Sequence, residues 1–504
     1  MTNNLRCLNY YREYYFALRR STDSEHNRHH QHVPRNVKVF AHVRSLHSES
    51  PLPPHCLRTT HEEREHLILI DNVSLCNDVM DVRGKTLTAA LIWTGNTFEK
   101  AIQIRVDSDG TIVDIGKQIL KHDEQLIDLG QKALIPGFVN AHSHAFHHHM
   151  RGRSHIGSAT SENFWKWRDE MYSLVENINR QQLYEYSLAT FKEMLSAGIT
   201  TVGEFHYVHH GTKQFDLDSA ILDAARDAQI RIVLIDTLYC RAGFGSEALA
   251  NAQKRFISTT DELIASAEEL DKSKHANQTI AVSAHSLRAV PLNDCIRLSE
   301  WATNNSKPLH IHIEEQPKEI VDCIDALHSS PSQLILDKIS AATCLTAVHC
   351  TFTLTTTMEA FAQRGINVCV CPLTEGYLGD GIPNIVDESQ ICLGTDCNNR
   401  ICMLEEMRWL AYCQHMKKNS RQACGLDARK LLRIATENGA RSLGLEHTVG
   451  RFEVGMQLDF VAFDLSSPRI ASIPTDELLD AIIFGAGNAD IITSAVSARV
   501  VYSS

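Results

Sequence analysis

The sequence lacks the features that mark membrane proteins and nucleic-acid-binding proteins. It contains no apolar run approaching the roughly 20 residues that a membrane-spanning helix needs. It also has no basic excess, because 49 Lys and Arg stand against 61 Asp and Glu, for a formal net charge of -12. Nucleic-acid binders usually present a basic face. We therefore expect neither a membrane nor a nucleic acid among the partners of this protein.

A regular cysteine framework is absent as well. The 15 cysteines are scattered along 504 residues, and a chain of this length does not need a disulfide scaffold to fold. Cys369 and Cys371 lie in VCVCP, an apolar run of strand type, and do not form the CxxC spacing of a metal or redox pair. The cysteine pattern thus favours free thiols in a reducing compartment, and we expect a cytoplasmic protein.

Residues 1–66 differ from the rest of the chain because they show no lasting apolar period and contain the Pro-rich piece SPLPPH. We predict a disordered or weakly ordered extension. Arg6, Arg12, Arg19 and Arg20 lie among few acids, which leaves an organelle-targeting role open. The tract HNRHHQH leaves weak metal binding open, although a solvated tail is the simpler interpretation.

Short strand-like runs follow from about residue 67 and return near the other end of the chain. LILIDNVSL, LTAALIW, AIQIRV and TIVDIG are separated by turn signals such as SDG, and GMQLDFVAFDL and AVSARVVYS have the same character. We predict that residues 67–138 and 446–504 pair into one small β-sandwich domain.

Strand-like and helical patterns alternate over residues 139–445. RIVLIDTL and PLHIHI are typical of buried strands, whereas SENFWKWRDEMYSLVENI and EEMRWLAYCQHM have helical periodicity. Repeated strand-then-helix units indicate parallel strands joined by crossover helices. At this length the commonest solution is a (β/α)8 TIM-like barrel, which we predict for this span.

Four apolar runs end in residues that bind metals or transfer protons. Side chains two apart on a strand face the same side, and barrel active sites lie at the carboxyl ends of the strands. One such residue is usually structural, but four successive strand ends are hard to assign to chance. The runs are LIPGFVNAHSHAF with His142 and His144, PLHIHIEEQ with His310, His312 and Glu315, LTAVHC with His349, and ICLGTDC with Asp396.

This set of residue types suits a metal-assisted hydrolysis. Two histidines from one strand, one from a later strand and a carboxylate fit a single Zn²⁺ with one position left for water. Zinc lowers the pKa of such a water to about 7, a nearby His or Asp can accept its proton, and a protonated Glu can donate to a leaving nitrogen. No strand here offers an evident lysine to bridge two metals, so we expect one Zn²⁺ per chain.

Several longer motifs agree in order with one known family. The sequence resembles the amidohydrolase superfamily, and within it most closely the formimidoylglutamate deiminases of histidine degradation. The resemblance extends from about Leu87 to the C-terminus. The motifs are HSHAF (142–146), FWKWRDEMY (164–172), EFHYVHH (204–210), HSLRAV (285–290), HIHIEEQ (310–316), LGDGI (378–382) and EEMRWL (405–410).

The resemblance implies a role for each of these positions. It implies zinc ligands at His142, His144, His312 and Asp396, a proton donor at Glu315, a base at His349 helped by Asp396, and groups that hold the substrate carboxylates at Arg168, Tyr207, His285 and Arg288. Guanidinium groups bind carboxylates in a bidentate manner, which suits the two carboxylates of a glutamate-derived substrate.

Two positions depart from the family pattern. His147 stands where the family usually has a Gln that contacts the formimino end of the substrate, and Cys397-Asn398 follow Asp396 where the family has Ser-His. The amide of Gln offers an acceptor oxygen and a donor NH2 side by side, whereas each nitrogen of an imidazole is either a donor or an acceptor. The departures put the substrate in question more than the reaction.

The expected activity is hydrolysis of N-formimidoyl-L-glutamate to N-formyl-L-glutamate and ammonia. An aminohydrolase of the same superfamily that acts on a purine, a nucleoside or another amidine is the alternative, and His147 gives it weight. A metal-free relative kept as a scaffold is a third possibility, against which the complete ligand set speaks. Relatives of this kind are often dimers, so we expect a homodimer.

Overall fold

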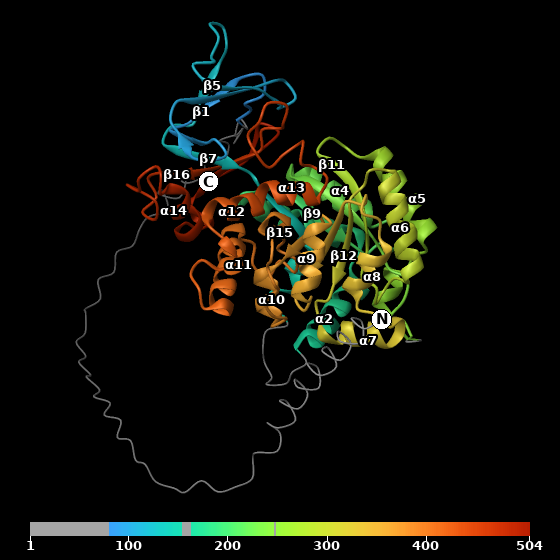
Figure 1. Cartoon of the computed structure of the whole chain (residues 1–504). Helices are drawn as coiled ribbons and strands as arrows, with labels where there is room; N and C mark the ends of the chain where they lie inside the picture. The colour runs from blue at the N-terminus through green and yellow to red at the C-terminus, as the bar shows by residue number, and fades with distance from the viewer. Residues whose placement is uncertain (1–79, 154–162, 246–247) are drawn as a thin grey trace, which may run out of the picture. The chain divides into compact units, whose positions relative to one another are not determined.

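The computed structural model describes residues 80–153, 163–245 and 248–504 (Figure 1). The predicted extension over residues 1–66 and the first strand-like run, LILIDNVSL, lie outside the described residues. Within the described ranges no helix is long and apolar enough to cross a membrane. The twelve cysteines in these ranges are all free thiols.

The central element is a sheet of eight parallel strands that follow one another in chain order. Each strand is almost wholly buried, as expected for a parallel sheet covered on both faces. This arrangement confirms the predicted (β/α)8 barrel (Figure 1). The strands are β8 (Phe138–Ser143), β9 (Ile199–His206), β10 (Arg231–Leu238), β11 (Gln278–Ala284), β12 (Leu309–Ile313), β13 (Leu345–His349), β14 (Asn367–Val370) and β15 (Ile391–Leu393).

Helices cover the outside of this sheet, and local signals fix where several of them begin. Asn179 with Gln182 and Thr259 with Glu262 form capping boxes at the starts of α3 and α5. The helices are α2 (Asn163–Asn177), α3 (Arg180–Ser196), α4 (Asp218–Ala228), α5 (Thr260–Ser273), α6 (Leu292–Asn304), α7 (Pro317–Leu327), α8 (Pro331–Lys338), α9 (Thr355–Gln363), α10 (Pro372–Leu378), α11 (Met403–Lys418), α12 (Ala428–Arg433), α13 (Gly439–Ser442) and α14 (Leu478–Gly485), with the 3-10 helix η1 (Ala145–Met150) directly after β8.

The barrel closes where the first strand meets the segment after the last. The N–H of His144 donates to the carbonyl of Asp396 over 2.9 Å, and the N–H of Asp396 donates to the carbonyl of His142 over 3.0 Å. These two bonds flank a parallel bridge between Ser143 and Asp396. Gly394 allows the close approach, because a Cβ there would lie 2.8 Å from both the Cβ and the carbonyl oxygen of His142.

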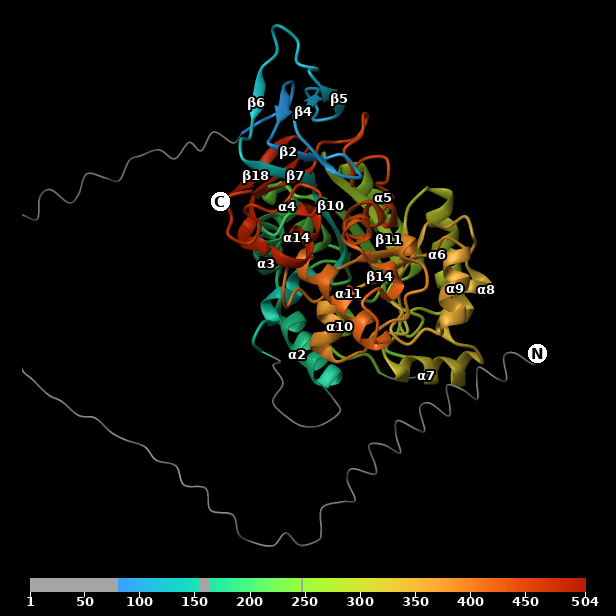
Figure 2. The ribbon, with the colours of Figure 1, turned by 60° about the vertical axis from the view of Figure 1, so that its left-hand side comes forward.

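Two smaller sheets lie outside the barrel, and one of them combines strands from the N-terminal and C-terminal parts of the described chain. β7 (Lys132–Pro136) leads into the barrel and pairs antiparallel with β16 (Phe460–Asp464), so strands from both ends share one sheet, as predicted (Figures 1 and 2). The six-stranded sheet also contains β2 (Leu91–Trp93), β3 (Phe98–Glu99), β17 (Ile491–Val496) and β18 (Arg499–Ser503). The four-stranded sheet contains β1 (Thr86–Thr88), β4 (Ile102–Val106), β5 (Ile112–Lys117) and β6 (Leu126–Asp128).

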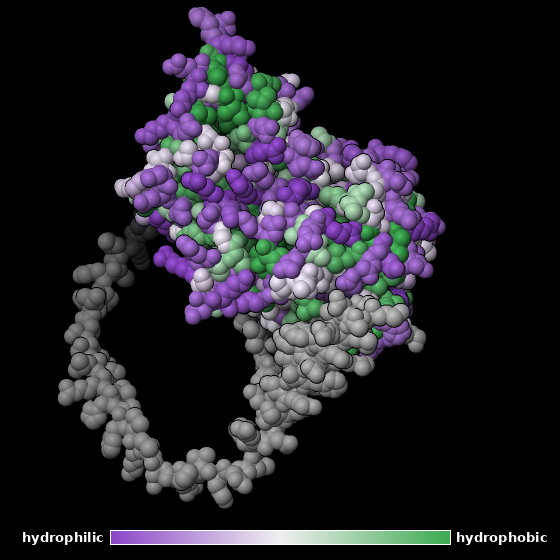
Figure 3. Space-filling model, in the orientation of Figure 1, coloured by the Kyte–Doolittle hydropathy of each residue, from purple (hydrophilic) through white to green (hydrophobic). Residues whose placement is uncertain are grey.

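The two smaller sheets share an apolar core that includes Leu87, Ile104 and Phe460. Apolar surface remains visible over the four-stranded sheet, where Val113 and Leu126 are 45% and 38% exposed (Figure 3). A buried ion pair between Arg231 and Asp459, 3.0 Å apart, joins the start of β10 to the residue before β16. The sheets are thus anchored to the barrel, while the exact domain boundaries stay a prediction.

Replacement of Gly394 by alanine should disturb barrel closure. The added Cβ would overlap backbone and side-chain atoms of His142, so we expect a loss of about 1–3 kcal/mol in the free energy of unfolding, as is usual for an overpacked core. Urea denaturation measures this. Gly485→Ala is the matched control, since a Cβ at Gly485 would meet nothing within 4 Å. Equal stability of both variants would contradict this description of the closure.

Candidate metal centre

One pocket at the carboxyl ends of the barrel strands gathers the residues singled out in the sequence. Ten of the eleven predicted site residues line it, and the eleventh, His142, lies deeper and is fully buried. The lining residues from the prediction are His144, His147, Arg168, Tyr207, His285, Arg288, His312, Glu315, His349 and Asp396.

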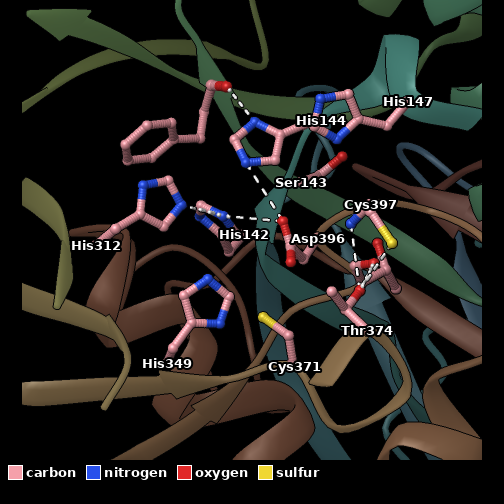
Figure 4. Close-up of polar contacts among 12 residues, drawn as sticks. His142, Ser143, His144, His147, His312, His349, Cys371, Thr374, Asp396 and Cys397 are labelled. Carbon is pink, nitrogen blue, oxygen red and sulfur yellow. Dashed lines mark hydrogen bonds and ion pairs between the residues drawn. The ribbon is translucent and has the colours of Figure 1, made fainter. Parts of the chain in front are cut away.

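Three imidazoles and one carboxylate converge at the base of this pocket (Figure 4). The Nε2 atoms of His142 and His312 lie 3.2 Å apart. Oδ1 of Asp396 lies 3.5 Å from Nε2 of His142 and 3.3 Å from Nε2 of His144. Four ligands placed tetrahedrally at zinc distances would be separated by about 3.4 Å. The three separations lie close to that value, so these groups fit a single bound ion.

The hydrogen bonds of the other ring nitrogens support the same conclusion. Nδ1 of His144 donates to the carbonyl of Phe205 over 2.8 Å, and Nδ1 of His312 donates to the carbonyl of His285 over 3.0 Å. Metal-binding histidines are commonly held by such bonds. With the proton on Nδ1, Nε2 of His144 presents a lone pair to the ionised Asp396, 3.3 Å away, and the two groups repel each other unless a cation lies between them.

The pKa values agree with this set of ligands. Burial lowers the pKa of His142 to about 3 and lowers those of His144 and His312, so the rings are neutral. Burial alone would raise the pKa of Asp396, but its bond to His142 and the nearby imidazoles hold the pKa well below its usual range. Neutral imidazoles and an ionised carboxylate are the forms that bind Zn²⁺.

His349 and Glu315 lie beside the converging ligands. The ring of His349 stacks on that of His312 at 5.3 Å, and its Nε2 lies 3.9 Å from Oε1 of Glu315. Burial raises the pKa of Glu315, which favours its protonated form. Burial would lower the pKa of His349, but Glu315 and Glu375 outweigh that effect and raise it to about 10. A bound cation would lower it again.

The outer part of the pocket is both basic and aromatic. The guanidinium group of Arg168 lies 5.4 Å from the ring centre of Tyr172. Nε2 of His147 and the hydroxyl of Tyr207 share a hydrogen bond of 2.9 Å. Further lining residues, for which no role was predicted, are Trp167, Met171, Tyr172, Tyr239, Ala242, Phe256 and Leu378. A signal existed for Tyr239, which follows directly on the strand run RIVLIDTL.

The residues that depart from the family pattern after Asp396 brace the ligand loop. The side-chain amide of Asn398 donates to Oγ of Ser143 over 3.1 Å and to the carbonyl of His144 over 3.0 Å. Cys397 places its sulfur 3.2 Å from the hydroxyl of Thr374. In this chain Asn398 therefore fixes the HSH segment from behind.

Left-handed backbone conformations cluster at the strand ends that carry the site. Outside glycine such conformations cost roughly 1–3 kcal/mol each and persist only where surrounding contacts impose them. The φ angles are 53° at Glu314, 73° at His349, 51° at Cys350, 44° at Asp396 and 52° at Asn398.

A second buried group of His and Asp lies after β9, around the loop that carries Tyr207. Oδ1 of Asp218 lies 3.0 Å from both Nε2 of His206 and Nδ1 of His209, and Nε2 of His209 donates to the carbonyl of Thr237 over 2.8 Å. These distances are those of direct hydrogen bonds, shorter than the 3.2–3.5 Å of the first group. We interpret the second group as an ion-pair network that braces the loop.

Comparison with known proteins gives one family. The model of the amidohydrolase family matches residues 133–501. A formimidoylglutamate deiminase of Pseudomonas aeruginosa is 30% identical over 414 residues, which cover 79% of this chain and 90% of that protein. A 5'-deoxyadenosine deaminase of Methanosphaera stadtmanae is 25% identical over 437 residues, which cover 84% and 91%.

Solved structures agree with the fold. The crystal structure of an amidohydrolase from Brucella melitensis superimposes with a TM-score of 0.74 at 27% sequence identity. The match covers 82% of this chain and 94% of that one.

Loss of one converging imidazole should release the metal. Loss of a residue that only orients a metal ligand typically weakens metal binding roughly 10–100-fold. We expect His312→Gln, which removes a ligand itself, to weaken zinc binding by more than this. Elemental analysis after dialysis against a chelator measures the zinc retained. His310→Gln is the control, because His310 lies on the same strand and bonds instead to the carbonyl of Ser442. Equal zinc content in both variants would contradict the ligand assignment.

The second group should contribute to stability and leave zinc content unchanged. Removing one partner of a buried ion pair typically costs about 3–5 kcal/mol, so Asp218→Asn should lower the free energy of unfolding by that order. Burial lowers the pKa of His209, but Asp218 outweighs this and raises it to about 9, above the unfolded value of 6.5. The contribution of His209 is therefore full below pH 6.5 and is lost as the pH rises through about 9. Urea titrations at pH 6.5 and 9.5 should show the difference from wild type shrinking at the higher pH.

Proposed function

The chain belongs to the amidohydrolase family, and its matched relatives include a deiminase and a deaminase, which hydrolyse C–N bonds. From that membership we propose that the protein converts N-formimidoyl-L-glutamate and water to N-formyl-L-glutamate and ammonia. The observation that carries the proposal is one pocket that combines a converging ligand set, a carboxylic acid and imidazole pair, and two arginines. This reaction belongs to histidine degradation.

Four residues would hold one zinc ion: His142, His144, His312 and Asp396. When bound, zinc would act as a Lewis acid that acidifies water at neutral pH and polarises the carbon–nitrogen double bond. The chain itself prepares the site, because backbone carbonyls fix the tautomers of His144 and His312.

His349 and Glu315 would move the protons. His349 accepts the proton that the attacking water loses as its oxygen bonds to the formimino carbon. Glu315, kept protonated by burial, donates a proton to the terminal nitrogen. The carboxylate of Glu315 then takes the hydroxyl proton of the tetrahedral carbon, and the nitrogen receives its second proton from His349. The bond from that nitrogen to carbon breaks, ammonia leaves, and the formyl group remains on the glutamate nitrogen. General acid–base catalysis of this kind typically contributes 10²–10⁴-fold.

The two arginines would bind and orient the glutamyl part of the substrate. Arg168 comes from α2 and Arg288 from the segment after β11, and both line the same pocket as Glu315. Two guanidinium groups match two carboxylates in number and charge. Tyr207, His147 and His285 line the same pocket beside the two arginines. Holding the substrate in place in this way lowers the entropic part of the activation barrier.

An aminopurine or nucleoside is the second candidate substrate. Trp167, Tyr172, Tyr239 and Phe256 add aromatic rings to the pocket, which could stack on a flat base. His147 in place of the family Gln and the similarity to a 5'-deoxyadenosine deaminase also favour this candidate. A substrate without carboxylates would leave Arg168 and Arg288 without a partner in the substrate.

Ammonia release by the zinc-loaded protein tests the proposal. N-formimidoyl-L-glutamate is offered beside N-formimidoyl-L-aspartate, adenosine-type nucleosides and aminopurines. We expect release from the glutamate compound, and a kcat lower by roughly 10²–10⁴-fold in Glu315→Gln. Release from a nucleoside alone would reject the proposal in favour of the second candidate, and absence of stoichiometric zinc would favour a non-catalytic relative.

Arg168→Ala provides the second arm of the same experiment. Loss of a hydrogen-bonded charge costs about 1.5–3 kcal/mol, so kcat/KM for the glutamate compound should fall roughly 10–100-fold. Lys166→Ala, on the exposed side of the same helix, should change it little. An unchanged kcat/KM in Arg168→Ala would contradict a role in binding carboxylates.

A further inference from the structure

Nδ1 of His349 faces a buried carboxylate that none of the functional motifs identified. Oε1 of Glu375, on α10, lies 3.5 Å from this nitrogen. Glu375 is 3% exposed and His349 is 1% exposed. No hydrogen bond to this nitrogen is formed within the described residues, so Glu375 is the acid placed to receive its proton.

Glu375 is itself held in a fixed position. The N–H of Cys371, the residue before α10, donates to Oε1 of Glu375 over 3.0 Å. Two residues further on, the N–H of Leu373 donates to Oε2 of Glu406, on α11, over 2.9 Å. The start of α10 is thus tied down at two points, and the carboxylate of Glu375 cannot move away from His349 without breaking the bond to Cys371.

His349 needs such a contact because its backbone does not fix its ring. It ends β13 with a left-handed φ of 73° and is followed by Cys350 with a φ of 51°. Its ring stacks on His312, a flat contact that fixes the plane of the ring but does not distinguish the two orientations related by a 180° flip about the Cβ–Cγ bond. Its two nitrogens point to two carboxylates, with Nε2 3.9 Å from Glu315 and Nδ1 3.5 Å from Glu375.

We propose that Glu375 is a positioning residue that acts through His349. It holds the Nδ1 proton, so that the neutral ring presents the lone pair of Nε2 to the pocket on the side of Glu315. A carboxylate that orients an imidazole and selects its tautomer in this way is a recurrent device in hydrolases. The inference rests on the proposed role of His349 as the base, and it holds equally for a formimidoyl or an aminopurine substrate.

Glu375→Gln tests the inference with little change of shape. The amide oxygen can still accept from Cys371, while the side chain loses its charge and one of its two acceptor oxygens. We expect kcat to fall roughly 10–100-fold, with KM within about twofold and zinc content unchanged. Glu406→Gln is the matched control, because Glu406 is also buried and braces the same segment without contacting His349. Equal losses of kcat in both variants would show a merely structural role and overturn the proposal.

A double-mutant cycle with His349→Asn shows whether Glu375 acts through His349 or independently of it. We expect Glu375→Gln to have no further effect in the His349→Asn background. The same fold-loss in both backgrounds would overturn the proposal. The cycle is measured with whichever compound the wild-type protein hydrolyses. If the wild-type protein does not hydrolyse N-formimidoyl-L-glutamate, the proposed function is rejected, but the cycle still tests the role of Glu375.

A crystal structure of the zinc-loaded Glu375→Gln variant gives a readout that does not depend on turnover. We expect the His349 ring to rotate away from its position in the wild-type structure, with the zinc ligands in place. A ring that stays in position with Nδ1 still facing residue 375, together with wild-type kcat, would overturn the inference.

Discussion

The site depends on two backbone hydrogen bonds that close the barrel. They run in opposite directions between the His142–His144 segment and Asp396, so the first and last strands are joined at the residues that supply three of the four proposed ligands. More than 250 residues of chain separate His144 from Asp396, and the side chain of Asn398 reinforces the junction with bonds to Ser143 and His144. Barrel closure and assembly of the site are therefore one structural event, and Gly394 provides the space for it.

The converging groups are costly to the apo fold. The neutral imidazole of His144 presents a lone pair to an ionised carboxylate, Glu315 is buried, and five residues at the strand ends adopt left-handed φ angles. Contacts behind the site offset these costs. Asn398 holds the HSH segment, the network around Asp218 braces the loop with Tyr207, and Glu375 stands behind His349. A bound cation would remove the largest repulsion, so the metal and the fold should stabilise each other.

Much of the fold and of the group of converging side chains could be predicted because their signals are local. The run RIVLIDTL coincides with β10 at both ends. The alternation in HIHI separates His312, which faces the pocket, from His310, which bonds to the carbonyl of Ser442. The structure also separates the roles of the five histidines between His142 and His149. His142 and His144 enter the ligand group and His147 lines the pocket, whereas His148 bonds to Glu193 and His149 stacks on Tyr186. The parts that were missed depend on contacts across the chain. Nothing near Glu375 in the sequence indicates that α10 will point it at His349, and Asn398 gains its role only when β15 meets β8.

The pairing of β7 with β16 has a consequence for biosynthesis. β7 leads directly into β8, but its partner strand emerges from the ribosome more than 300 residues later. Until then the first barrel strand lacks its neighbour on the closing side, and β7 lacks its partner on the β16 side although β2 can already pair with it. Contacts so distant in sequence form slowly. The nascent chain must therefore keep the apolar β7–β8 segment from associating with other chains for most of its synthesis. Exposed, unpaired strands of this kind are the sites at which partly folded chains aggregate.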